Sequence, residues 1–555
     1  MELQFVLGCF LLIFGVGQAV KEDFIGVSYN RNTGTFDFAA KRDNNAQYSA
    51  YAYFKNDINS TLWSYLELYT ADIVDDETQA YAAGLAEGNI TRDLMRMHWY
   101  NTMDGYCAEP LTAYCKRLKD YLRTNFNWVS EQIRANPNDT YWHQVKLFLI
   151  QMNGLQDGYD GKVRKPSFDV EDVFGMVVMW QVAGDLEDLE IVLKKGEIDR
   201  PVGSGSCSAL IKLLPDNSDI YISQVTWNGY QSMLRIIKRY AFLFHHAGTK
   251  GSRPIPGNDM AFSSYPGSLT SGDDFYIINS GLVTQETTIG NGNADLWKYV
   301  TPTGTVVEGI RSMVANRLAT SGKEWAATFT AHNSGTYNNQ WMVVDYKKFT
   351  PGKPLSPGLL YIIEQIPGLV HSEDMTDLLK KQLYWPSYNV AYFKDVFNAS
   401  GGPGMIAKYG DWFSYNHTAR ANIFRRDQSK VHDLPSMVSM MRYNNFQNDP
   451  LSKCDCNPPY SGENAIAGRS DLNPANGTYP FGALGHRNHG GTDAKITSYK
   501  HAQWLEMIAC GGPTYDQVPA FQWSKADFGP TTRHMGHPDV FKFNPIIHKW
   551  GGRRD

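Results

Sequence analysis

The sequence predicts an α+β protein in which helices pack on antiparallel sheets. The first half carries long stretches with apolar residues three and four positions apart, a spacing typical of helices. The second half carries short β-rich runs separated by turns of Gly, Pro and Asn. No internal repeat, low-complexity tract or long polar linker divides the 555 residues. We therefore expect both halves to share one core.

The first residues have the pattern of a signal peptide. An apolar run from Phe5 to Val16 is followed by the small residues that signal peptidase prefers, so residues 1–19 are expected to be removed. This run and all later ones fall short of the roughly 20 apolar residues that a membrane helix needs. We therefore expect an exported protein without an integral membrane segment. Six Asn-x-Ser/Thr sequons are expected to carry glycans, namely Asn59, Asn89, Asn138, Asn398, Asn416 and Asn476.

Helices are expected over residues 117–137 and 140–154, separated at Pro137, and over residues 167–193. The composition then changes. Residues 194–206, KKGEIDRPVGSGS, are charged and then rich in glycine and serine, as an exposed and cleavable loop should be.

Short strands are expected immediately after this loop. The runs CSALIKLLP (207–215) and IYISQVTW (220–227) indicate a hairpin with its turn at residues 215–219. A helix is expected over residues 230–244. Further strand-like runs cover residues 275–289, 339–346 and 358–366.

The net charge is −5, with no cluster of basic residues. A nucleic-acid partner is therefore not expected, because such proteins carry a basic patch that neutralises phosphates.

Six cysteines remain once Cys9 is lost with the signal peptide, and an even count in an oxidising compartment favours pairing. We expect Cys107 to pair with Cys115, which closes a short loop. Cys454 is expected to pair with Cys456 or with Cys510, which leaves Cys207 free. A metal half-site at Cys454 and Cys456 is disfavoured, because no partner cysteines and histidines stand at finger spacing. No metal and no cofactor are expected.

The usual hydrolase signatures are missing from the sequence: there is no Gly-x-Ser-x-Gly, no His-Glu-x-x-His and no Walker loop. Cys207 instead opens a strand directly behind a cleavable loop. Breaking the Ser206–Cys207 bond would give this residue both a thiol and an α-amine. That amine has a pKa of about 7.7 to 8.0 in peptides, which suits a general base. From position alone, a buried structural cysteine is the favoured alternative.

Several segments together resemble the phospholipase B-like family. They include CSALIKLLP, TWNGYQSMLRIIKRY, FSSYPGSLTSGDDFYI, NSGTYNNQWMVVDYK, YGDWFSY, DLNPANGTYPF and FQWSK, and the resemblance spans essentially the whole mature chain. The resemblance implies an N-terminal nucleophile hydrolase with a four-layer αββα core. It further implies localisation to the lysosome lumen or secretion. It also implies that Cys207 is the nucleophile and that residues 20–206 and 207–555 form two chains that stay associated.

Further site residues are expected around Cys207. The end of the second hairpin strand, with Gln224, Trp227 and Asn228, should lie beside it. Some relatives carry histidine where this chain has Gln224, which leaves a titrating partner there in doubt. An amide N–H at Asn338 or Asn339 is a candidate donor to the oxyanion that develops during acyl transfer, with an Asn-rich turn as the alternative. Arg420 resembles a late arginine that related cysteine hydrolases place near the nucleophile, with a surface cation as the alternative.

Other conspicuous residues receive plainer interpretations. Asp273 and Asp274 are expected to cap or turn the chain rather than to orient a site. His486 and His489 are expected to lie in a loop without a metal. The sequence also favours Trp412 and Trp523 as core aromatics over ligand platforms.

The expected reaction is acyl transfer to water on a lipid or N-acyl substrate, through thiol attack and an acyl-enzyme. The resemblance points to fatty-acyl esters of glycerophospholipids. An amidase of N-acylated lipids or peptides and a non-catalytic lysosomal lipid-binding protein are the alternatives. The sequence leaves a homo-oligomer open.

Overall fold

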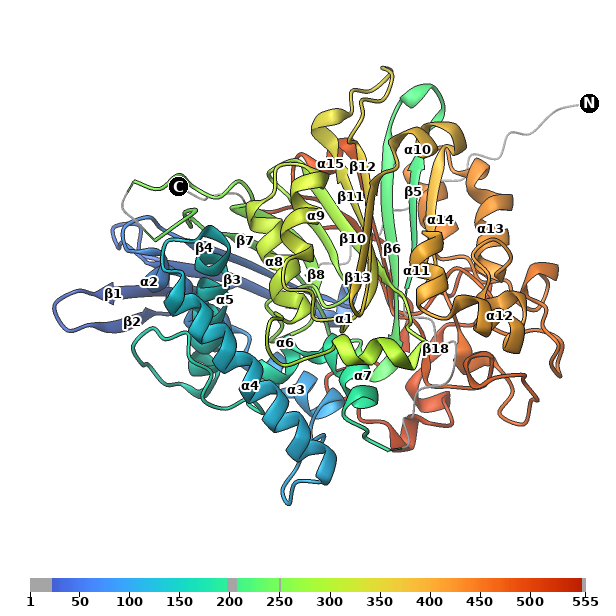
Figure 1. Ribbon diagram of the computed structural model, residues 1–555. Helices are drawn as coiled ribbons and strands as arrows, with labels where there is room; N and C mark the ends of the chain where they lie inside the picture. The colour runs from blue at the N-terminus through green and yellow to red at the C-terminus, as the bar shows by residue number, and fades with distance from the viewer. Residues whose placement is uncertain (1–21, 197–206, 249–250, 552–555) are drawn as a thin grey trace, which may run out of the picture.

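The computed structural model describes residues 22–196, 207–248 and 251–551 (Figure 1). The signal peptide and Ser206, at the expected cleavage point, lie outside these residues. No helix within the described ranges is long and apolar enough to cross a membrane.

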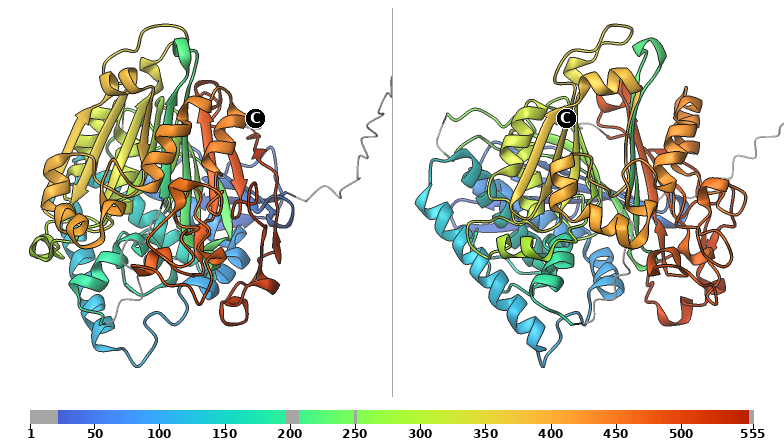
Figure 2. Two further views of the ribbon diagram at one scale, coloured as in Figure 1. Left: turned by 90° about the vertical axis from the view of Figure 1, so that its right-hand side faces the viewer. Right: turned by 45° about the vertical axis from the view of Figure 1, so that its right-hand side comes forward.

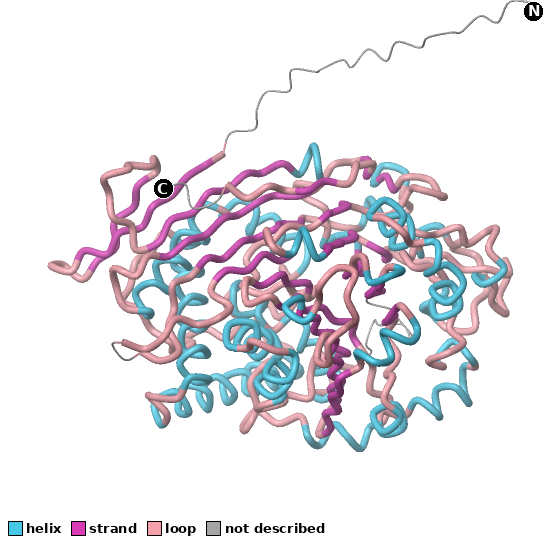
Figure 3. The backbone as a smooth tube through the Cα atoms, turned by 90° about the horizontal axis from the view of Figure 1, so that it is seen from above, coloured by secondary structure: helices cyan, strands magenta, loops and turns pink. Residues whose placement is uncertain are grey.

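Within this part of the chain, the larger sheet has 11 strands in the order β13-β12-β11-β10-β9-β8-β7-β4-β3-β1-β2. Their pairing is antiparallel except between β4 and β7, which run parallel. The view from above shows the strand directions turning across the molecule, as in a twisted sheet (Figure 3). The strands are β1 (Asp23–Asn30), β2 (Thr35–Ala39), β3 (Ala50–Asp57), β4 (Trp63–Thr70), β7 (Arg235–Ala241), β8 (Asp259–Ser264), β9 (Phe275–Ile278), β10 (Leu282–Thr288), β11 (Asn339–Asp345), β12 (Leu360–Ile366) and β13 (Leu369–Asp374).

The smaller sheet contains the expected hairpin of β5 (Cys207–Leu213) and β6 (Ile220–Gly229). Its order is β14-β5-β6-β16-β17-β20, and β15 pairs with the end of β6. The other strands are β14 (Tyr384–Ser387), β15 (His489–Gly491), β16 (Asp493–Ser498), β17 (Ile508–Gly511) and β20 (Ile546–Ile547).

The two sheets pack face to face. Alternate residues of β5 and β6, such as Ala209 and Ile222, share one apolar core with alternate residues of the larger sheet, such as Ile277 and Met342. The intervening residues of each sheet point outward into separate cores. The layers therefore follow in the order helices, sheet, sheet, helices.

The outer face of the larger sheet is covered by the helices that the sequence predicted, together with four others. Helices α4 and α5 confirm the first two predictions, but the third stretch is helical only from Met176, where α6 begins, with α7 following from Ala183. Asp139 caps α5 by accepting from the Trp142 N–H at 3.0 Å. The helices are α2 (Asp76–Ile90), α3 (Arg92–Thr102), α4 (Ala113–Ala135), α5 (Thr140–Asp160), α6 (Met176–Gln181), α7 (Ala183–Val192), α8 (Glu308–Leu318) and α9 (Gly322–Thr330).

The outer face of the smaller sheet is covered by α13 and α14, with α11 and α12 beside them, in the orange part of the chain (Figure 2). These helices are α11 (Lys394–Ala399), α12 (Gly402–Tyr409), α13 (Ala419–Asp427) and α14 (Leu434–Met441).

The helix expected over residues 230–244 is wrong, because this segment forms β7 inside the larger sheet. Its strand is buried on both faces, with Ile236 in the outer core and Ile237 in the core between the sheets. Arg235 and Lys238 are fully buried in ion pairs, so the segment lacks both the alternation of a surface strand and a polar face.

Both expected disulfides are present, Cys107–Cys115 and Cys454–Cys456. Cys207 and Cys510 are buried free thiols. Among the sequon asparagines, Asn89 is half-buried near the end of α2, and the other five are exposed. Occupancy by glycans stays a prediction.

Candidate functional site

Cys207 opens β5, with Thr226 of β6 directly opposite. Its side chain lies on the same strand face as Ala209 and Ile211, which point into the core between the sheets. The residue is 3% exposed. Burial raises the pKa of the Cys207 thiol well above its usual value, and the charge of Glu286 adds to this shift. In the uncut chain the thiol is therefore protonated.

Cys207 lines a pocket of about 730 Å³, whose walls come from the end of β6, the loop before β9 and the helices α3, α6 and α7. The end of β6 supplies Trp227 and Asn228 to the same pocket, so the structure brings these two residues together with Cys207, as expected. The larger sheet supplies Tyr337 and the loop before β9. Charged and amide side chains, such as Asp273 and Asn228, line the pocket together with aromatic ones, a mixture that suits a reacting centre with charge.

Gln224 lies two residues before Thr226 on β6, opposite Ala209, and is not among the residues that line this pocket. Its amide donates to the backbone carbonyls of Asp273 at 2.5 Å and Glu286 at 2.7 Å. It therefore joins the two sheets behind the site.

Arg420, in the first turn of α13, binds the backbone of Cys207. Its Nη1 donates to the Cys207 carbonyl at 2.6 Å, and its Nη2 donates to the Tyr388 carbonyl at 2.9 Å. The guanidinium also lies over the Trp227 ring, 4.6 Å from its centroid. Burial lowers the pKa of Arg420 to about 10, so it remains charged at neutral pH. The surface-cation alternative is wrong, because this side chain is buried.

Asn338 and Asn339 stand at the start of β11, outside the described lining of the Cys207 pocket. The Asn338 amide donates to Asp188 at 3.1 Å, and the Asn339 amide donates to Glu308 at 3.1 Å. Glu308 does line the pocket. Asn339 therefore contacts the pocket only through Glu308. The side-chain amides of both asparagines donate hydrogen bonds to carboxylates of the protein.

Asp273 is a site residue that the sequence interpretation missed. Its Oδ2 accepts from Thr226 at 2.8 Å, from Arg235 at 2.6 Å and from Lys495 at 2.6 Å, all fully buried or nearly so. Burial alone would raise the pKa of Asp273, but the two cations together hold it well below its usual range. The expectation of a turn or cap role is therefore wrong for Asp273, which is the centre of an ion cluster beside the pocket.

Two further buried carboxyl groups, Asp274 and Glu308, line the same pocket, and Glu286 is a third buried carboxyl group close enough to act on the Cys207 thiol through its charge. Burial, and then the charge of Asp273, raises the pKa of Asp274 to about 7. Burial and neighbouring carboxylates raise the pKa of Glu286 and Glu308 well above their usual values. These three carboxyl groups are therefore protonated and neutral in an acidic medium. The negative charge around the Cys207 thiol is then smaller than at neutral pH.

Two non-glycine residues beside the pocket adopt left-handed backbone angles, Asp274 with φ 52° and Tyr337 with φ 48°. Such conformations cost free energy and gather at functional sites. The Tyr337 hydroxyl donates to the Gly272 carbonyl at 3.1 Å, which fixes its ring at the pocket wall. No sequence pattern could have indicated this geometry.

The described residues hold no group of three or more side chains suited to a metal. His489 lies on β15 and lines the Cys207 pocket, and His486 pairs with Asp527 at 3.0 Å. Trp523 is a buried core residue, as expected. Trp412 is half-buried at the wall of a second pocket.

One family model and several curated proteins match this chain over most of its length. The family model of phospholipase B matches residues 50–548. Phospholipase B-like 2 of Homo sapiens is 53% identical over 509 residues, covering 90% of this chain and 86% of that protein. Phospholipase B-like 1 of Caenorhabditis elegans is 45% identical, covering 90% of this chain and 87% of that protein.

A comparison of structures finds penicillin V acylase of Agrobacterium tumefaciens, with a TM-score of 0.28 and 10% identity, covering 61% of this chain and all of that one. From the family model and the relatives, this chain belongs to the phospholipase B-like family.

Proposed function

We propose that this protein is a self-processing acyl hydrolase in which cleavage before Cys207 turns that residue into an N-terminal nucleophile. The observation that carries the proposal is the place of Cys207: a free, buried thiol at the first residue of a central strand, on the wall of a polar pocket. The order of helices, sheet, sheet and helices is the one expected of N-terminal nucleophile hydrolases and supports the same assignment.

Processing requires attack of the Cys207 thiol on the carbonyl carbon of Ser206. The peptide C–N bond then breaks, the nitrogen takes up a proton, and a thioester joins the two residues. Water hydrolyses the thioester, which gives a carboxylate on Ser206 and a free amine and thiol on Cys207. Arg420 would hold the Cys207 carbonyl in place during these steps.

Turnover would follow the same chemistry on a substrate. The α-amine of Cys207 takes the thiol proton, and the thiolate attacks the acyl carbonyl. The proton passes to the leaving alcohol or amine, and an acyl-enzyme remains until water hydrolyses it. Cys207 thereby supplies both the nucleophile and the base. This mechanism therefore needs no histidine at position 224, where this chain has Gln224.

The substrate that we propose is a fatty-acyl ester of a glycerophospholipid, in keeping with the names of the relatives. The place of action that we propose is the lysosome lumen or the extracellular space. Neutral Asp274, Glu286 and Glu308 at acidic pH suit the lysosome, because they reduce the negative charge facing the thiol.

The test is acyl release by the processed protein at acidic pH from phosphatidylcholine and from an N-acylethanolamine. We expect Cys207→Ala to abolish fatty-acid release. Cys510→Ala, which removes the other buried free thiol, should keep it. Release from the amide alone would make the protein an amidase. Binding of phospholipid vesicles without release from either substrate would make it a lipid-binding protein and refute the proposal.

A further inference from the structure

We propose that a second pocket, beside the one lined by Cys207, binds a single acyl chain of the substrate. This inference rests on the proposed function and names the part of the substrate that each pocket receives. The second pocket, here called the acyl pocket, has a volume of about 340 Å³. It lies between the end of β10, α7 and the segments around α11 and α12.

The acyl pocket adjoins the Cys207 pocket. Glu187, Thr288 and Tyr337 line both. Arg420 lines the acyl pocket and binds the Cys207 carbonyl from that side. We infer that, when the carbonyl of a substrate lies at the Cys207 sulfur, its acyl chain passes Tyr337 into the acyl pocket.

The walls of the two pockets differ in chemistry. Beyond the shared residues, large apolar side chains line the acyl pocket, namely Ile191, Ile289, Val390, Phe397, Met405 and Trp412. The Cys207 pocket instead presents Asn228, Asp273, Asn488 and other polar groups. The lining of the acyl pocket is mainly apolar, whereas polar and apolar groups are balanced in the Cys207 pocket. An apolar chain is therefore better accommodated in the first, and a polar alcohol or amine leaving group in the second.

Helix α12 forms the outer wall of the acyl pocket and is loosely packed. It contains no buried residue, and Gly401 and Gly410, with φ 88° and 79°, stand at its two ends. Met405 of this helix lies close to Gly292 on the inner wall: a Cβ added to Gly292 would lie 3.7 Å from the Met405 sulfur. The wall can therefore accept chains of different thickness by small movements of α12.

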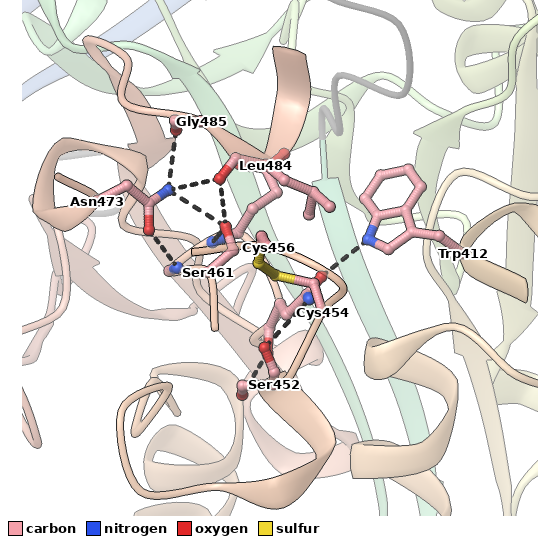
Figure 4. Close-up of a disulfide and its surroundings, with 11 residues drawn as sticks. Trp412, Ser452, Cys454, Cys456, Ser461, Asn473, Leu484 and Gly485 are labelled. Carbon is pink, nitrogen blue, oxygen red and sulfur yellow. Dashed lines mark hydrogen bonds between the residues drawn. A yellow bond between two sulfur atoms is a disulfide. The ribbon is translucent and has the colours of Figure 1, made fainter. Parts of the chain in front are cut away.

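The end of the pocket beyond α12 is more rigid. Trp412 donates from its Nε1 to Asn464 at 2.8 Å, close to the Cys454–Cys456 disulfide (Figure 4). Trp412, Phe413 and Cys454 pack against one apolar cluster there. We infer that this end limits the length of the chain.

The test compares Met405→Trp, which fills the acyl pocket, with Ala407→Trp, which adds the same ring to an exposed position of the same helix. Substrates are p-nitrophenyl esters of acetate, octanoate and palmitate. For the unaltered protein, kcat/KM should rise with chain length by up to about fourfold per buried methylene. Met405→Trp should lower kcat/KM for octanoate at least tenfold and change that for acetate less than twofold, and Ala407→Trp should resemble the unaltered protein.

A second measurement separates this inference from the proposed function. Decanoate is titrated calorimetrically into the processed protein, which reports binding without turnover. Tenfold weaker binding to Met405→Trp, and also to Val390→Trp on a different segment, supports the acyl pocket even if no ester is hydrolysed. No decanoate binding to the unaltered protein, or equal losses for all chain lengths in the variants, would overturn it.

Discussion

At the scale of single residues, Asp274 is a carboxyl group whose protonation should change within the physiological range. It is fully buried beside the charged Asp273, and its pKa is raised from 3.8 to about 7. Because the folded-state pKa lies above that of the unfolded chain, the stability linked to this group is fully present below about pH 4. It is lost as the pH rises through about 7.

Asp274→Asn should test this linkage, because an amide resembles the neutral acid but cannot ionise. We expect the free energies of unfolding of variant and wild type to be similar at pH 4 and the variant to become more stable than wild type at pH 8. The difference should grow by at most about 1.4 kcal/mol per pH unit. Urea unfolding at several pH values measures it, and a difference independent of pH would show that Asp274 does not titrate in this range.

Arg420 should determine how well the Cys207 carbonyl is placed. Arg420→Ala leaves two buried carbonyls without their charged donor, at a cost of about 1–3 kcal/mol for each. We expect self-cleavage to slow at least tenfold, with partial recovery in Arg420→Lys. Arg425→Ala, on the exposed side of the same helix, is the control. The appearance of the processed chain over time gives the rates, and equal rates in all variants would remove Arg420 from the site.

The candidate site could be predicted only where local pattern and position carry the signal. Cys207 follows a stretch rich in glycine and serine in the sequence and opens a strand, and Trp227 and Asn228 follow from the hairpin. Asp273 looks like a turn residue, because its partner Lys495 lies 222 positions later in the sequence. Its role depends on the contact between the two sheets, which a single sequence does not reveal.

At the scale of elements, the ion cluster around Asp273 joins the sheets beside the pocket. Lys495 on β16 and Thr226 on β6 belong to the smaller sheet, and Arg235 on β7 belongs to the larger one. Removing one partner of a buried pair leaves uncompensated charge.

Asp273→Asn should therefore lower the free energy of unfolding by about 3–5 kcal/mol. Asp259→Asn makes the same change in the partly exposed pair with Arg239 and should cost only about 0–1 kcal/mol. Chemical denaturation of both variants measures the comparison. Equal small losses would mean that the cluster contributes little to holding the sheets together.

Element types were predictable for an amphipathic segment such as α4, whose periodicity matches its burial, and for α5, whose apolar residues stand at helical spacing although the helix is buried on nearly all sides. β7 was not, because a strand buried on both faces with paired internal cations has no single periodicity. The strands β1 to β4 were also not anticipated, since β4 ends at Thr70 and the strand that it pairs with on the other side, β7, begins only at Arg235.

At the scale of the whole molecule, the residues before and after the expected cleavage point form one folded unit. β4 pairs with β7, and α2 and α5 pack in the core of the larger sheet. Neither disulfide links the two parts, because Cys107–Cys115 lies wholly before residue 207 and Cys454–Cys456 wholly after it.

We therefore expect the two processed chains to elute together in size-exclusion chromatography with or without a reductant, because packing rather than a disulfide joins them. Guanidinium chloride should separate them. Dissociation by reductant alone would contradict the single shared core.

The most direct test of the account is mass analysis with N-terminal sequencing of the full-length protein after incubation at acidic pH, beside Cys207→Ala and Cys510→Ala. The account predicts two chains for wild type and for Cys510→Ala, the larger beginning at Cys207. It predicts a single uncut chain for Cys207→Ala. A wild-type protein that stays uncut, or a Cys207→Ala variant that is cut at the same bond, would contradict the assignment of Cys207 as the nucleophile.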